Sequence, residues 1–310
     1  GGELTINGGR YTANMGNGIL VQNGTAIVEG GTFIGADAYT PGTADSAANA
    51  GPAASYAFKL YGGTLAVNGG TFTDQATTGT GSRYAGSGAF VMGSAERSAT
   101  ATITAGTFNV AGTAAFAVYS HATVTFGTEG SADNEVIQLA GESAAITVEG
   151  TDGNSGSSVT IYNGTYWCNS PKSGGGSDGI FYGEGTTKLN IYGGVFSGVG
   201  DPESSGTVGR SGLYIADDPV ADDPGTNIQI SGGRFIGQDP SSAYNVGMWY
   251  GYYNGGGISV SVELNRIGWL SEYINVNISE IIADGHSVQQ TSDTGLVCRY
   301  LSSYTTVTVV

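Results

Sequence analysis

The stretch 65-LAVNGGTF-72 has six counterparts elsewhere in the chain, at residues 4–11, 26–33, 101–108, 159–166, 189–196 and 228–235. In each of these octets the first and third residues are apolar, and the residue between them is usually polar or small. This is the period of two that a β-strand has when one side is buried and the other faces solvent. Each octet therefore predicts a short strand with an apolar inner side.

The second half of the octet predicts a sharp bend. Its sixth residue is glycine in all seven copies, and its fifth is glycine in five, with Ala105 and Asn163 as the exceptions. Glycine pairs after an alternating strand mark a corner, because the backbone there needs a positive φ or lies too close to its neighbours for a Cβ. The eighth residue is always Phe or Tyr and is expected to point back into the core. One octet thus encodes a strand, a corner and the start of a second strand.

A further apolar strand is expected after each octet. These strands span residues 18–21, 56–60, 88–92, 115–119, 179–182, 212–215 and 247–250. The segment between the aromatic residue and this strand varies from six to 22 residues. Insertions in stacked repeats usually gather on one side of the stack. We therefore expect eight or nine coils, with loops of unequal length along one edge.

Octets of the form V-x-I-x-G-G-x-F with variable insertions resemble those of the right-handed parallel β-helix proteins of the pectin-lyase-like superfamily. More narrowly, residues 1–257 are similar to GGTF-repeat segments of large bacterial cell-surface proteins described as candidate adhesins. The resemblance implies an all-β fold, a single-stranded right-handed parallel β-helix. It carries little information about chemistry, because one fold supports many functions.

Residues 258–310 no longer follow the octet. They still contain strand-like segments, at residues 258–264, 266–282, 294–303 and 305–310, and a helical turn is the alternative near Trp269. A coil at the end of a stack leaves backbone N–H and C=O groups unpaired, which invites aggregation unless something covers them. We expect residues 258–310 to be degenerate final coils or a C-terminal cap of the same domain.

Composition favours an exported all-β protein. The 310 residues include 55 glycines and only 12% charged residues, which leaves few of the residues that stabilise helices. The net charge of −16 would repel a phosphate backbone, so nucleic acid is not expected as a partner, whereas calcium is a more natural companion. The chain has no apolar run long enough to cross a bilayer, so we expect no membrane insertion. We predict an extracellular or cell-surface location, with the leader absent from the given chain.

The most acidic stretch is 216-ADDPVADDPG-225, which contains Asp217, Asp218, Asp222 and Asp223. Carboxylates at this density either bind a hard cation such as calcium or repel one another into solvent. The spacing is not that of an EF-hand loop. A solvated loop stiffened by proline is therefore the favoured interpretation, and a calcium site is the alternative.

A second candidate site is aromatic. Tyr244, Trp249, Tyr252 and Tyr253 lie beside the last octet, and Trp167 opens another insertion. Aromatic faces next to Asn and Asp suit neutral sugars, which stack their CH-rich faces and donate hydroxyl hydrogen bonds. Strand alternation turns part of such a run inward, so ordinary core and cap packing is the favoured interpretation of these residues.

Enzymatic activity is the less favoured interpretation, and no catalytic residue is assigned. A polysaccharide lyase needs a basic residue beside acidic calcium ligands, and Arg210 is the only basic residue near the aspartates. A glycoside hydrolase needs paired carboxylates, whereas His121 and His286 stand alone. The expected function is a non-catalytic extracellular surface or adhesion module that binds carbohydrate or a host surface protein through the loops on one edge of the β-helix. A lyase or hydrolase of the superfamily is the alternative.

The two cysteines, Cys168 and Cys298, lie far apart in the sequence without the spacing of a metal site. They are separate packed thiols or one optional bridge, and separate thiols are favoured.

Overall fold

The structure is a computed structural model, and it describes residues 1–13, 17–35, 56–74, 88–110, 114–141, 144–148, 156–168, 178–182, 188–198, 211–217, 228–238, 248–254, 258–263, 285, 288–292 and 304–309. Within these ranges every regular element is a β-strand. The strands form two sheets, one of 16 and one of nine strands. The prediction of an all-β fold is confirmed. No helix in this part of the chain is long and apolar enough to cross a membrane.

The strands are arranged on three faces. Face 1 contains β1 (Gly2–Ile6), β4 (Gly24–Val28), β11 (Ala122–Phe126), β14 (Ser158–Ile161), β17 (Lys188–Ile191) and β20 (Ile228–Ile230). Face 2 contains β2 (Arg10–Thr12), β5 (Thr32–Gly35), β12 (Ile137–Gly141), β15 (Thr165–Cys168), β18 (Val195–Ser197) and β21 (Gly233–Gln238). Two longer strands, β7 (Gly63–Asp74) and β9 (Ala99–Asn109), run through the corner and belong to both faces, which joins faces 1 and 2 into the larger sheet.

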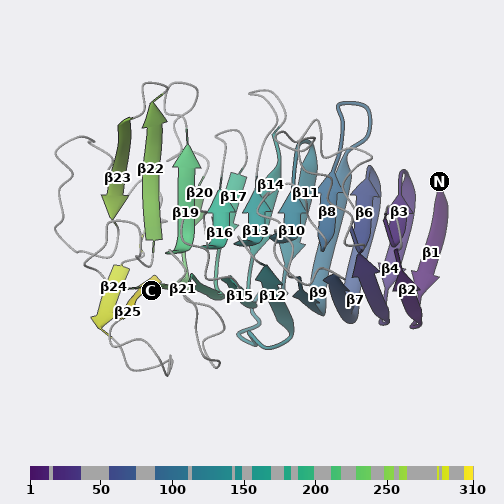
Figure 1. Cartoon of the computed structure of the whole chain (residues 1–310), viewed down its shortest axis with the longest axis horizontal. Coiled ribbons are helices and arrows are strands. Elements are labelled where there is room, and N and C mark those ends of the chain that lie inside the picture. The colour runs from purple at the N-terminus through teal and green to yellow at the C-terminus, as the bar shows by residue number, and fades with distance from the viewer. Residues whose placement is uncertain are drawn as a thin grey trace.

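Face 3 belongs to the nine-stranded sheet. It contains β3 (Ile19–Val21), β6 (Phe58–Tyr61), β8 (Ala89–Met92), β10 (Ala114–Val118), β13 (Ala144–Val148), β16 (Asp178–Tyr182), β19 (Ser211–Asp217) and β22 (Met248–Asn254). The chain visits faces 1, 2 and 3 in turn, and one such circuit is a coil. The described strands make eight coils, which follow one another along the long axis of the molecule (Figure 1).

Successive coils pair in parallel and in register. Leu65 pairs with Ala26 on one side and Ala101 on the other, so the first octet position forms a continuous inner row. Phe72 likewise lies between the aromatic residues of the neighbouring octets. The glycine pairs therefore turn corners between parallel strands and are not the tips of antiparallel hairpins. This arrangement is that of a parallel β-solenoid.

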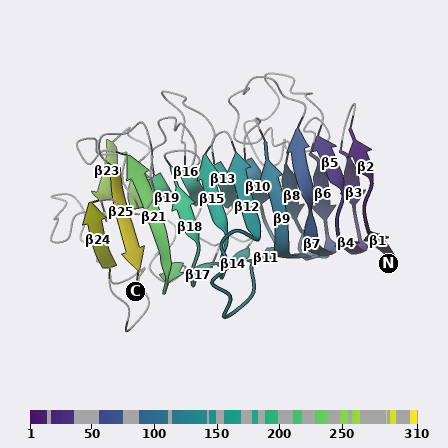
Figure 2. The same ribbon diagram turned by 90° about the horizontal axis from the view of Figure 1, so that it is seen from below.

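Antiparallel strands follow the last coil. On face 3, β23 (Ile258–Glu263) pairs antiparallel with β22. On face 2, β25 (Tyr304–Val309) pairs antiparallel with β21, and β24 (Val288–Ser292) pairs antiparallel with β25 (Figure 2). The described strands after residue 257 thus depart from the parallel coils. That these strands cap the C-terminal end of the solenoid stays a prediction.

One coil has no octet and is absent from the sequence prediction. It consists of β11, β12 and β13, and its inner residues keep the register of the neighbouring coil, with Val124 beside Ala101 and Phe126 beside Ile103. Residues 127–136, which we call the corner loop, replace its glycine pair. Leu139 takes the place of the octet aromatic.

The core is a column of stacked aromatic rings with a break at this coil. Ring centroids are 5.1, 4.6 and 4.2 Å apart along the row Tyr11, Phe33, Phe72, Phe108. They are 5.0 and 4.8 Å apart along the row Tyr166, Phe196, Phe235.

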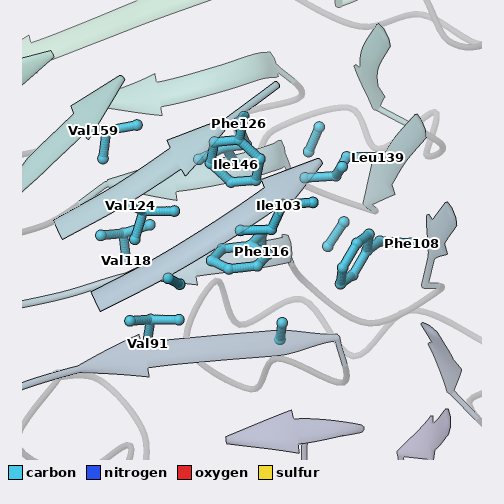
Figure 3. Close-up of a cluster of buried hydrophobic side chains, with 14 of the residues drawn as sticks. Val91, Ile103, Phe108, Phe116, Val118, Val124, Phe126, Leu139, Ile146 and Val159 are labelled. Atoms are coloured by element: carbon cyan, nitrogen blue, oxygen red, sulfur yellow. The ribbon is translucent and has the colours of Figure 1, made fainter. Parts of the chain in front are cut away.

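Two further rings, Phe116 and Phe126, bridge the break through the middle of the core (Figure 3). They make edge-to-face contacts at 5.7 Å from Phe108 to Phe116, 5.0 Å from Phe116 to Phe126, and 5.9 Å from Phe126 to Tyr166.

Insertions occur at more than one corner. The sequence predicts variable length only between the aromatic residue and the strand of face 3. Residues 149–157 and 218–227, however, connect face 3 to face 1, and the corner loop connects face 1 to face 2. The expectation of loops along a single edge is therefore wrong, because these connections place further insertions at the other two corners of the coil.

Candidate functional site

The predicted calcium ligands are only partly described. Asp217 is the last residue of β19, where its Cα pairs with that of Tyr252 on face 3. Asp218, Asp222 and Asp223 lie outside the described residues. Among the residues that the structure describes, no three His, Cys, Asp or Glu side chains are grouped so that they could hold a metal ion. Calcium binding by the four aspartates stays a prediction.

The predicted aromatic site falls on two faces. Trp249, Tyr252 and Tyr253 follow one another along β22 on face 3, whereas Trp167 lies on β15 on face 2. Tyr244 lies outside the described ranges. The fold thus places Trp167 in a different sheet from the other aromatic residues. Sugar binding by this set stays a prediction.

The structure describes only some of the cysteine, histidine and arginine residues considered in the sequence. Cys168 is buried at the end of β15, and Cys298 is outside the described residues. His121 is half-buried in the turn between β10 and β11, where its φ is 53°. His286 and Arg210 are also outside the described part of the chain.

The corner loop is ordered by its own hydrogen bonds. The backbone N–H of Ser131 donates to the carbonyl of Thr128 at 3.0 Å. The N–H of Asp133 donates to the Ser131 hydroxyl at 3.3 Å, and the N–H of Glu135 donates to the Asp133 carboxylate at 3.0 Å. Short polar side chains that accept from backbone two residues later stabilise turns of this kind. The corner loop is a fixed protrusion from the stack, visible beside β12 in Figure 1.

The corner loop docks on the next coil through Asn163. This side chain is 3% exposed, and its amide nitrogen donates to the Ser131 hydroxyl at 3.0 Å and to the Asp133 carbonyl at 2.7 Å. Asn134 adds two bonds, because its side chain accepts from Gly164 N–H at 3.0 Å and its carbonyl accepts from the Thr165 hydroxyl at 2.9 Å. Asn163 therefore departs from glycine in its octet because it holds the corner loop of the preceding coil.

Tyr166 completes this corner from inside the core. Its hydroxyl donates to the Asn163 carbonyl at 2.7 Å, as the hydroxyl of Tyr11 does to Gly8 at 3.0 Å in the first coil. Complete burial raises the pKa of Tyr166 well above its ordinary value. Where the eighth octet residue is tyrosine in place of phenylalanine, its hydroxyl thus forms a hydrogen bond with the backbone of the corner in the same octet.

The most exposed aromatic side chain lies on the outer side of the same corner. Tyr162 and Tyr192, which we call the tyrosine ridge, hold the fourth position of neighbouring octets. Their rings stack with centroids 5.1 Å apart and planes 17° apart. Tyr192 is 53% exposed, which is the largest exposure of any aromatic residue whose side chain the structure describes.

The fourth octet position carries polar residues elsewhere in the stack. Asn68 donates from its amide to the Glu29 carboxylate at 3.1 Å, and the Thr104 hydroxyl donates to the Asn68 side-chain oxygen at 2.8 Å. Ser231 follows Tyr192 on the next coil. The fourth octet residues therefore form one outward row along the solenoid. Its first part is the hydrogen-bonded series Glu29, Asn68 and Thr104, and the tyrosine ridge follows on the other side of the corner loop.

Hydroxyl and amide side chains cover face 1 beside this row. Thr102, Thr125 and Thr160 pair in one outward file, which continues to Asn190 and Gln229. Thr125 belongs to the coil that the sequence prediction missed, and it joins Thr102 and Thr160 into one continuous file. The face beside the tyrosine ridge is thus polar and built on regular strands.

The outward groups of this region are tyrosine rings, hydroxyls and amides. Groups of these types can stack on a flat ring and form hydrogen bonds. The sequence held the signal for the tyrosine ridge, since the fourth column of the octets reads Asn7, Glu29, Asn68, Thr104, Tyr162, Tyr192 and Ser231. These two adjacent aromatic residues in an otherwise polar column were not predicted as a site.

Comparisons with protein-family models, with curated proteins and with solved structures give no match for this chain.

Proposed function

We propose that this chain is a non-catalytic extracellular surface or adhesion module that binds carbohydrate or a host surface protein. The observation that carries the proposal is the division between constant coils and variable insertions. Core residues repeat in register from coil to coil, while the connections between strands differ in length at each coil. A rigid scaffold that holds changeable segments is the usual arrangement of repeat proteins that bind extended ligands.

The coil is proposed to be right-handed, as in the pectin-lyase-like superfamily that the octets resemble. Connections between parallel strands of one sheet are right-handed in about 98% of cases, because right-twisted strands pack back onto their sheet only in that sense. Every coil here connects parallel strands of one sheet through the other faces. The proposed hand thus follows from a general rule together with the observed parallel pairing.

Charge supports an extracellular role. With 26 acidic and ten basic residues, the net charge is −16, which favours solubility and disfavours polyanionic ligands. Neutral glycans and surfaces with exposed cations are therefore better partners than nucleic acid or acidic polysaccharide. Calcium is kept as a proposed companion of the acidic segment 216–225.

The test is a binding panel of neutral glycans, acidic glycans and extracellular-matrix proteins probed with the intact chain. Retention on at least one member is expected, with neutral glycans ahead of acidic ones. Failure to bind any member would overturn the proposal. Parallel incubation with the same polysaccharides, with and without calcium, checks for enzymatic activity. Release of new reducing or unsaturated ends would instead support the lyase or hydrolase alternative.

A further inference from the structure

The tyrosine ridge is exposed although the fold does not require it to be aromatic. Other octets fill the fourth position with Asn, Glu, Thr or Ser, and the coils still pair in register. An outward ring at this position adds no core packing. Tyr192 is 53% exposed, and its ring contact within the described part of the chain is with Tyr162.

Stacking leaves one ring face of Tyr192 uncovered by the row. Tyr162 covers one face, with centroids 5.1 Å apart. On the other side the equivalent residue is Ser231, whose small hydroxyl bonds back to the Ile191 carbonyl at 3.4 Å. The row of rings ends there, so a flat ligand can lie against Tyr192 above Ser231.

Polar residues lie on the strands next to Tyr192. Asn190 is on β17, two residues before Tyr192, and is half-buried. Gln229 is its register partner on β20 and is exposed. Amide side chains can both donate and accept hydrogen bonds, which matches the hydroxyl groups of a sugar. The contact with Tyr162 fixes the orientation of the Tyr192 ring in advance, which lowers the entropic cost of binding.

The chemistry favours a neutral sugar over other occupants. An aromatic face beside amides binds the CH-rich face of a sugar ring while its hydroxyls are hydrogen-bonded. A net charge of −16 opposes acidic polysaccharides. A protein partner generally needs a wider apolar patch than two tyrosine rings.

We propose that Tyr192, supported by Tyr162, is the stacking platform of a binding site for neutral glycans on face 1 of the solenoid. The inference rests on the proposed function, because it assigns a site to a glycan-binding module. Asn190 and Gln229 supply the polar contacts. The two tyrosines directly follow β14 and β17, Asn190 and Gln229 lie on β17 and β20, and none of these residues belongs to the long connections between strands.

The experiment compares the whole chain with three variants on a panel of cellulose, xylan, mannan, galactan and, as an anionic control, polygalacturonate. Tyr192→Ala is expected to weaken binding to the neutral polysaccharide that the wild type prefers by about tenfold or more, as for loss of a central aromatic contact. Tyr192→Phe keeps the ring and is expected to bind within about threefold of the wild type. Leu20→Ala removes a similarly exposed apolar side chain, 47% exposed, at the far end of the stack and should have no effect.

The outcomes separate the two proposals. If the wild type binds a neutral polysaccharide and Tyr192→Ala binds it equally well, the tyrosine site is wrong while the binding function stands. If the wild type binds only polygalacturonate, or nothing on this panel, the site is again wrong. The proposed binding function fails as well only if the panel of extracellular-matrix proteins also shows no binding. Thermal denaturation of Tyr192→Ala checks folding, and equal loss in Tyr192→Ala and Leu20→Ala would also contradict the site.

Discussion

Gly127 and Asn163 depend on each other. Gly127 has a φ of +85°, and a Cβ placed there would overlap the side-chain oxygen of Asn163. That oxygen is buried and has no hydrogen-bond partner, so it packs directly over the glycine. The sequence singled out Asn163 as an exception to the glycine pair. It could not supply the reason, because the partner loop belongs to a coil without an octet.

This dependence predicts a large difference between two glycine substitutions in the corner loop. Gly127→Ala is expected to cost several kcal/mol, because the strain of a positive φ adds to the clash with Asn163. Gly130→Ala is the matched control, since its φ is +79° but nothing lies within 4 Å of the added Cβ. It should cost only about 1–2 kcal/mol. Chemical denaturation of both variants measures the difference, and equal losses would contradict the packing described for Asn163.

Tyr166 predicts a pH-dependent effect. Tyr166→Phe removes the hydrogen bond to the Asn163 carbonyl and is expected to cost about 1 kcal/mol at neutral pH. Because burial raises the pKa of the folded Tyr166, its contribution is complete below about pH 10, the unfolded value, and is lost as the pH rises further. The variant should therefore lose less stability than the wild type between neutral and strongly alkaline pH. Urea unfolding at several pH values tests this, and identical alkaline profiles would count against it.

The coil made of β11, β12 and β13 explains the limits of prediction from octets. It has no glycine pair and no aromatic residue at the usual position, so the octet pattern does not predict it. Its inner residues still keep the register, with Leu139 beside Phe108 and Phe126 beside Ile103. Leu139 is smaller than its register partner and Phe126 is larger than its own, so the two changes in side-chain volume have opposite signs. Tertiary packing thus decided what the local sequence could not reveal.

The opposite changes in side-chain volume at Phe126 and Leu139 predict that substitutions at these two residues have non-additive effects on the free energy of unfolding. Phe126→Ile alone leaves a cavity beside Tyr166, and Leu139→Phe alone overfills the column, each at a cost of about 1–3 kcal/mol. Together they restore the pattern of the other octets and should cost less than the sum by about 1 kcal/mol or more. Denaturant unfolding of the four proteins gives the coupling. Phe33→Leu combined with Leu139→Phe is the distant control and should be additive, and additivity of the first pair would refute this prediction.

For the molecule as a whole, the repeat predicted the class of fold and the parallel stacking. Composition predicted the absence of helices, which holds for the described residues. The distribution of insertions over several corners could not be predicted, since it depends on the unrecognised coil and on connections from face 3 to face 1. The tyrosine ridge was also missed, although each of its residues occupies a predictable octet position. Which column faces a ligand is a property of the assembled surface and not of one octet.

The most direct test of the parallel, in-register solenoid is a disulfide between neighbouring coils. Thr102 and Thr125 are register partners on β9 and β11, so their Cα atoms should lie about 4.8 Å apart, within the range that a disulfide can span. Thr102 and Thr123 are offset by two residues and should lie about 8 Å apart, beyond that range. The measurement is disulfide formation on mild oxidation of each double-cysteine variant, mapped by mass spectrometry after chymotryptic digestion. The solenoid predicts an internal bond for Thr102→Cys with Thr125→Cys and little for Thr102→Cys with Thr123→Cys, whereas no bond in the first variant or a preference for the second would contradict it.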